Sequence, residues 1–241
     1  MIYIVVRKTT DWGDEVTFRA QIREGFEPVV EVWNATFTMP YHIFRRELKR
    51  IARLSLSRIP GAVCVPREEV PEYAVVVPTD DDDWFSPRLA EVLGANIDGQ
   101  HVGYYWPSKF IEVPIHLPHR LGLIRRAIFP RTRPHFLCTT NNYAVVMCSE
   151  MAPFVDNHVQ ASRWFVAHPA AVKRVGEHLS VMNRTLASRT SLWKKPPRPA
   201  LVRKYHRYQK LYGRALPPEL SWCEQSYAML RDLMDQLRLR R

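Results

Sequence analysis

The pattern of apolar and polar positions predicts an α/β domain followed by a basic helical segment. Residues 2–8 form an apolar run typical of a first β-strand, and Val75-Val76-Val77 has the pattern of a buried strand. Between them a helix is expected to begin at Thr38-Met39-Pro40 and to end before Pro60-Gly61. Its apolar residues recur at helical spacing: Ile43, Phe44, Leu48, Ile51 and Leu54. Its other side is basic, and we expect that side to be solvated: Arg45, Arg46, Lys49, Arg50 and Arg53.

The remaining elements are shorter or less regular. Residues 26–33 have the pattern of an extended segment, and a strand pair is expected at 101–106 and 110–113, joined by a tight turn at Pro107-Ser108. Two short β runs are expected within 136–147 and a helix at 159–166. From about residue 171 the chain is expected to be helical and basic, and Pro217-Pro218 precedes a final amphipathic helix.

Length and composition favour a globular protein. The chain has 241 residues, of which 46% are hydrophobic, enough for one sizeable α/β domain. No stretch approaches the roughly 18–20 apolar residues of a membrane span, and the apolar start lacks the order of a signal peptide. The four cysteines are widely separated and include no C-x-x-C, which argues against a structural zinc site and a disulfide framework. We therefore expect a cytoplasmic protein.

The net charge of +11 is concentrated near the C-terminus. From Lys194 onward there are twelve Lys or Arg residues against four Asp or Glu, a surplus of eight positive charges. Such a surplus indicates an anionic partner, which could be a phospholipid surface, a nucleic acid or a phosphorylated substrate. The alternative is a solvated basic face without a specific partner. We place the catalytic domain at residues 1–193 and a basic helical extension at 194–241.

Four consecutive aspartates, Asp80–Asp83, follow the predicted buried strand and precede Trp84-Phe85. Crowded carboxylates repel one another unless a cation intervenes, and Mg²⁺ and Mn²⁺ prefer oxygen ligands. Ser86 as N-cap and Pro87 at the first helical position predict a helix directly afterwards. A strand, an acidic turn and a helix in this order are typical of ligand sites beyond the carboxyl ends of strands. The alternative is a solvated acidic loop.

The segment Asp80-x-Asp82-Asp83-Trp84 resembles the DxD motif of nucleotide-sugar-dependent glycosyltransferases with the GT-A fold, and is similar to that of bacterial rhamnosyltransferases. The resemblance implies a GT-A-like, Rossmann-like mixed sheet flanked by helices, and a divalent Mn²⁺ or Mg²⁺ that bridges the diphosphate of the donor. It implies that Asp82 is the direct metal ligand and that Asp80 faces the metal's water shell or the ribose. Asp83 would support the site or contact the sugar, and Asp81 would lie on the donor side.

Further residues complete the expected site. His158 is the first choice for a histidine in the metal shell and His178 the second. Asp156 is the candidate general base, with Glu150 as the alternative; Asp156 is equally suited to cap the helix at 159–166. Other candidates are polar or aromatic residues suited to the donor: Arg7 for its base or phosphate, Trp84 for stacking, and Arg184 and Arg189 for the leaving diphosphate. Thr139-Thr140-Asn141-Asn142 suits sugar hydroxyls or a plain β-turn, and Trp84 equally suits the core.

These features lead to three functional hypotheses. The first is a metal-dependent glycosyltransferase that moves a sugar from a nucleotide-sugar donor to a glycan or lipid-linked acceptor, with the basic C-terminal region contacting an anionic membrane at its inner face. The second is a nucleic-acid-binding protein or Mg²⁺-dependent nuclease that uses the aspartates and the basic tail, with weak aromatic support from Tyr205, Tyr208 and Tyr212. The third is a non-catalytic interaction protein.

Overall fold

The computed structural model describes residues 1–7, 26–110, 138, 141–183, 185–187, 192, 196–212 and 215–240. The chain divides into two compact units. The described residues of unit 1 are 1–7, 52–110, 138 and 141–182; those of unit 2 are 26–51 and everything described from residue 183 onward. The predicted boundary between residues 193 and 194 falls inside unit 2.

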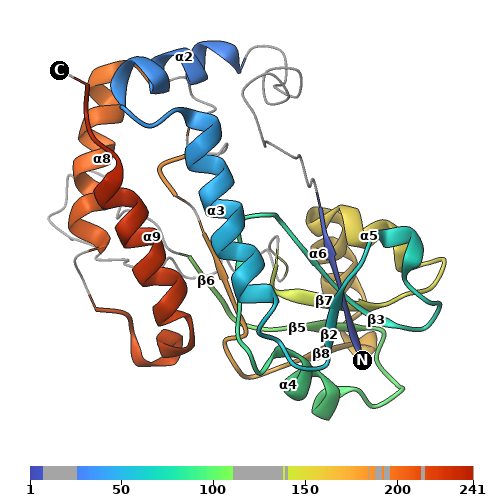
Figure 1. The fold of residues 1–241 in the computed structure, drawn as a ribbon. Helices are drawn as coiled ribbons and strands as arrows, with labels where there is room; N and C mark the ends of the chain where they lie inside the picture. Colours follow the sequence, from blue (N-terminus) through green and yellow to red (C-terminus); the bar gives the residue numbers. More distant parts are fainter. Residues whose placement is uncertain are drawn as a thin grey trace, which may run out of the picture. The chain divides into compact units, whose positions relative to one another are not determined.

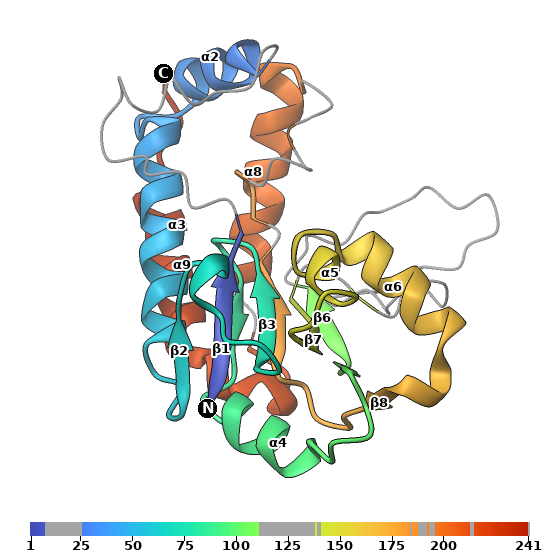
Figure 2. The same ribbon diagram turned by 90° about the vertical axis from the view of Figure 1, so that its right-hand side faces the viewer.

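Unit 1 is built on a mixed six-stranded sheet, as the α/β prediction requires. Its strands, in spatial order, are β2 (Ala62–Cys64), β1 (Ile2–Val6), β3 (Val75–Thr79), β7 (Tyr143–Val146), β5 (Gly103–Tyr105) and β8 (Val172–Arg174). The first three are parallel to one another, and Figure 2 shows them side by side. The strand β7 runs antiparallel to both of its neighbours, and β8 is parallel to β5. The predicted strands at 2–8 and 75–77 are confirmed.

Helices cover both faces of this sheet, because its central strands β1 and β3 are apolar at nearly every position. Ile2, Ile4, Val75 and Val77 pack with α4 (Leu89–Asn96) in one core. On the other face Val5, Val76 and Val145 pack with α5 (Ala152–Asp156) and α6 (His158–Ala167). Successive residues of β1 and β3 thus point to opposite cores, as the strand period of two demands. Figure 1 shows α5 and α6 on their side of the sheet.

Directly after the acidic run, the chain enters a second, three-stranded sheet. It consists of β4 (Trp84–Phe85), β9 (Ser180–Met182) and β6 (Ser108–Phe110), in that order. Two predictions are corrected here. The expected strand pair around Pro107-Ser108 is not a hairpin, because β5 and β6 belong to different sheets. The stretch after residue 171 is not yet helical: it contains β8 and β9 and short turns, with the 3₁₀ turn Pro169–Ala171 before them.

Two helix predictions can be compared with the structure here. The helix α3 (Tyr41–Leu56) lies where it was predicted. Its basic side is not wholly solvated, however, since Arg45 and Lys49 are each only 5% exposed. The helix after the aspartates begins at Leu89, two residues later than predicted, because the Ser86 hydroxyl accepts the Arg88 N–H in a turn before the helix.

The described part of unit 2 is mainly helical, and its first element corrects another prediction. Residues 27–36 form α2 (Glu27–Thr36), not an extended segment. This helix buries Trp33, whose ring lies 4.6 Å from that of Phe37 and 5.2 Å from that of Phe44. The later helices are α8 (Arg198–Tyr212) and α9 (Glu224–Gln236), with the 3₁₀ segment η3 (Pro218–Cys223) before α9. Figure 1 shows α8 beside α9.

The C-terminal residues are integrated into unit 2. Thr38 N donates to Arg238 O at 2.9 Å, Arg240 N donates to Thr36 O at 2.8 Å, and Arg240 Nε donates to Phe37 O at 2.8 Å. Phe37 and Leu239 form an antiparallel bridge. The segment predicted as an extension therefore shares its hydrogen bonds with residues 36–38, about two hundred positions earlier.

Candidate functional site

The order of the strands creates a natural ligand site at the carboxyl ends of β1 and β3. From β1 the chain goes to β2 on one side and then crosses back to β3 on the other. The strand order thus reverses between β1 and β3, and open α/β sheets bind ligands in the crevice at such a point. Arg7 is the first residue after β1, and Asp80 is the first after β3. Both therefore lie at this edge.

Arg7 and Asp80 form an ion pair there. Arg7 Nη2 lies 3.6 Å from Asp80 Oδ1, and the Arg7 side chain is only 6% exposed. The backbone N–H of Arg7 donates to Thr79 O at 2.7 Å, which fixes the end of β1 to the end of β3. A nearly buried guanidinium held in this way is preorganised to bind an anion, because the side chain loses little further conformational entropy when the anion binds.

The acidic turn is fixed at both ends and is only partly exposed to solvent. Asp80, Asp81 and Asp82 are half-buried, and Asp83 is 2% exposed. After the turn, β4 is held by Ser55, whose hydroxyl accepts the Phe85 N–H at 3.0 Å and donates to Phe85 O at 3.1 Å. Burying a carboxylate without a compensating partner is costly. A freely solvated loop therefore does not describe this segment.

Tyr143 belongs to the same edge, although the sequence analysis did not single it out. The strand β7 runs antiparallel to β3, so its first residue lies toward the carboxyl end of β3. The phenol is buried and donates to Phe154 O at 2.5 Å. Burial raises the pKa of Tyr143, the Arg7 guanidinium acts in the opposite direction, and the carboxylates of Asp80 and Asp156 raise it. These charged groups therefore lie within electrostatic range of one phenol.

Asp156, the candidate base, forms an ion pair with Arg67. Arg67 begins the 3₁₀ segment Arg67–Glu69 shortly after β2, so it too follows the carboxyl end of a parallel strand. No sequence signal distinguished Arg67 from other surface arginines. Asp156 is not the N-cap of α6: Asn157 fills that role, because its Oδ1 accepts the N–H groups of Val159 and Gln160, each at 3.1 Å. The structural role of Asp156 is therefore the ion pair with Arg67 and not the predicted N-cap.

Two other predicted site residues make contacts away from this edge or in the interior. Glu150 accepts the indole N–H of Trp164 at 3.2 Å. Trp84 is 0% exposed in β4, so its ring packs in the interior, and its indole N–H has no hydrogen-bond partner within the described part of the chain.

The candidate metal ligands are not gathered into a three-residue cluster. Over the ranges that the structure describes, no group of three or more His, Cys, Asp or Glu side chains is placed to hold a metal ion. Asp80, Asp82 and His158 thus do not form such a group, and His158 is the half-buried first residue of α6. His178 Nδ1 lies 3.1 Å from Pro107 O. Arg184, Arg189, Thr139 and Thr140 lie outside the described residues.

Asn141 and Asn142 belong to a buried network. Asn142 Nδ2 donates to Trp106 O at 2.8 Å, and Trp106 Nε1 donates to Ser180 Oγ at 2.8 Å. Ser180 Oγ in turn donates to Asn141 Oδ1 at 3.3 Å. Both amides are at most 1% exposed, so they join the two sheets and do not line a surface.

Comparison of the chain with protein-family models, curated proteins and solved structures finds no match. The residues of the edge themselves indicate its chemistry. The aspartates supply hard oxygen donors, and Mg²⁺ usually binds one or two carboxylates and completes its shell with waters and substrate phosphates. The half-buried Asp80–Asp82 turn fits this mode of binding without a three-ligand cage.

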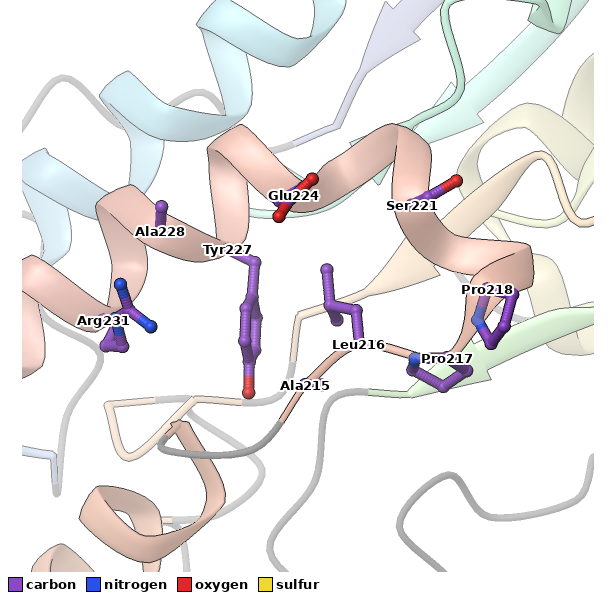
Figure 3. A pocket seen from close by; sticks show the side chains of 9 residues that line it. All are labelled: Ala215, Leu216, Pro217, Pro218, Ser221, Glu224, Tyr227, Ala228 and Arg231. Carbon is purple, nitrogen blue, oxygen red and sulfur yellow. The ribbon is translucent and has the colours of Figure 1, made fainter.

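A separate pocket of about 280 Å³ lies within unit 2. Figure 3 shows residues 215–217 on one side and the helical residues of η3 and α9 on the other, with the Tyr227 ring projecting from α9 toward Ala215. None of the predicted site residues lines this pocket.

None of the helices in the described ranges has the length and apolar character needed to cross a bilayer.

Proposed function

We propose that the protein is a metal-dependent glycosyltransferase of the GT-A type, which transfers a sugar from a nucleotide-sugar donor to a glycan or lipid-linked acceptor in the cytoplasm. One observation carries the proposal. The acidic turn is half-buried at the carboxyl edge of a mixed sheet, at the point where the strand order reverses, and a nearly buried arginine faces it. A diphosphate bound to a divalent cation carries both kinds of charge: the acidic turn can bind the cation, and the arginine can bind a phosphate.

The residues of this edge have different proposed roles in binding the donor. Asp82 and Asp80 are the proposed ligands of Mn²⁺ or Mg²⁺, and Asp83, which is buried, supports the turn. When bound, the metal would offset negative charge on the leaving nucleoside diphosphate. Arg7, which lies beside Asp80, would bind a phosphate or the donor base. Arg184 and Arg189 remain predictions for the leaving group.

Asp156 is the proposed general base. Its carboxylate pairs with Arg67, and a carboxylate is a group that can accept a proton from an acceptor hydroxyl. Asp156 also lies within electrostatic range of Tyr143, and so do Arg7 and Asp80. Glu150 is the alternative base, but its carboxylate is engaged by the Trp164 indole.

The test is a transfer and hydrolysis assay with UDP-, GDP- and dTDP-sugars in Mn²⁺ or Mg²⁺. We expect at least one donor to be consumed, and Asp82→Asn to lose roughly 10²-fold or more of that rate. Asp235→Asn, which removes an exposed carboxylate from α9, is the matched control and should keep full activity. Full activity of a folded Asp82→Asn variant would refute the assignment.

A further inference from the structure

The helix α8 presents two opposite faces. Its fifteen residues, 198–212, include five Lys or Arg and no Asp or Glu. Leu201, Tyr205 and Tyr208 lie three or four positions apart and are buried. At 100° per residue, Arg203, Arg207 and Lys210 lie on the opposite side of the helix, and all three are exposed. The cations therefore point away from the packed side of α8; we call them the α8 basic face.

The charge of this face is not compensated by neighbouring carboxylates. Within the described ranges, none of Arg203, Arg207 and Lys210 forms an ion pair. The exposed arginines of α3 differ in this respect. Arg46 Nε and Arg50 Nε lie 3.9 and 2.7 Å from carboxylate oxygens of Glu47. The α8 basic face thus attracts anions with little internal competition.

We infer that the α8 basic face docks the protein on an anionic phospholipid surface. A cluster of basic residues on an amphipathic helix is the arrangement that binds acidic headgroups. Tyr205 and Tyr208 cannot serve as a stacking platform for nucleic-acid bases, because they are only 7% and 2% exposed and the Tyr205 hydroxyl donates to Leu237 O at 2.7 Å. Leu201 on the same side of α8 is buried as well. The attraction of α8 to the lipid is therefore electrostatic and does not require insertion of apolar side chains into the bilayer.

The expected strength follows from the number of cations. Each Lys or Arg close to an anionic membrane raises binding roughly five-fold. Three such residues together contribute roughly a hundred-fold, and binding should weaken as salt screens the charges. This inference rests on α8 alone and does not depend on the sugar-transfer proposal.

The test is co-sedimentation of the full chain with vesicles. One set contains phosphatidylcholine only, and the other contains about one third phosphatidylserine. We expect binding to the anionic set alone, and a loss of roughly a hundred-fold in the triple variant Arg203→Gln, Arg207→Gln, Lys210→Gln. The matched control removes three exposed arginines from α3, Arg46→Gln, Arg50→Gln and Arg53→Gln, and should keep most of the binding. Circular dichroism confirms that both variants are folded.

Three results would overturn the inference. These are equal binding to both vesicle sets, anionic binding that the α8 triple variant retains, and binding of a single-stranded oligonucleotide that displaces the vesicles and depends on the same three residues. Asp82→Asn should bind the vesicles like the unmodified chain. Failure of sugar transfer and failure of membrane docking are therefore distinguishable.

Discussion

A single hydroxyl group holds the acidic turn in place at its far end. Ser55 makes two hydrogen bonds to the backbone of Phe85, and both are buried. Ser55→Ala should lower the free energy of unfolding by about 1–3 kcal/mol, because the Phe85 N–H loses its partner in the interior. Ser57→Ala is the control, since that exposed hydroxyl, in the turn after α3, donates to Leu54 O. Urea unfolding of both variants checks the difference; equal stabilities would contradict this role.

Asp156 and Asn157 are neighbours with separable roles. Asn157→Ala should lower the free energy of unfolding by about 1 kcal/mol, because α6 loses its N-cap. Asp156→Asn should change stability by only about 0–1 kcal/mol, since its ion pair with Arg67 is largely exposed. If Asp156 is the base, the same variant should lose sugar transfer over the whole pH range. Thermal unfolding and the transfer assay are measured on both; a fully active Asp156→Asn would make Glu150 the better candidate.

Asp98 makes the stability of the protein depend on pH in the acid range. The hydrogen bond from His101 chiefly holds the pKa of Asp98 below its usual 3.8, and the N–H of Gln100 and the Lys173 ammonium act in the same direction. A carboxyl with a lowered pKa in the folded state stabilises the protein above pH 3.8, and this contribution is lost progressively as the pH falls from about that value toward the lower pKa of the folded state. Asp98→Asn should therefore show a smaller loss of stability between about pH 5 and about pH 3. Urea unfolding at several pH values checks this, and parallel curves would contradict it.

Among the elements, the packing of α6 on the sheet depends on one glycine. A Cβ on Gly103 in β5 would lie 2.7 Å from the Phe165 ring, which is 1% exposed in the core. Gly103→Ala should therefore cost about 1–3 kcal/mol of unfolding free energy. Gly94 in α4 is the matched control: nothing lies within 4 Å of its Cβ position, so Gly94→Ala should stabilise the helix by about 0.4–1 kcal/mol. Denaturant unfolding of the pair should give shifts of opposite sign; a neutral Gly103→Ala would contradict the packing.

The sequence predicted long regular elements and missed short or context-dependent ones. The helix α3 has a long periodic pattern, and β1 and β3 are short apolar runs rich in β-branched residues and followed by charged residues, which favours strands. The strands β8 and β9 have three residues each, too few to show a period. The valine-rich start of α2 favours a strand locally, but packing of Trp33 against Phe37 and Phe44 favours the helix.

At the scale of the whole molecule, chain order was a poor guide to which segments pack together. The proline-rich break near residue 196 suggested an extension, whereas Arg238 and Arg240 bond residues 36–38. Arg7 and Asp80 could be placed from sequence, because residues that follow parallel strands share an edge. Arg67 and Tyr143 could not, since their positions depend on the strand order and on the pairing of β7 with β3.

Isothermal titration of the protein with UDP, GDP and CDP, in Mn²⁺ or in excess chelator, tests the central claim most directly. We expect at least one diphosphate to bind with Mn²⁺, and its affinity to fall about ten-fold or more in chelator and in Asp82→Asn, because the acidic turn and the ligand share the cation. If no diphosphate binds, or if one binds equally well without metal and in the variant, the acidic turn is not a metal–diphosphate site.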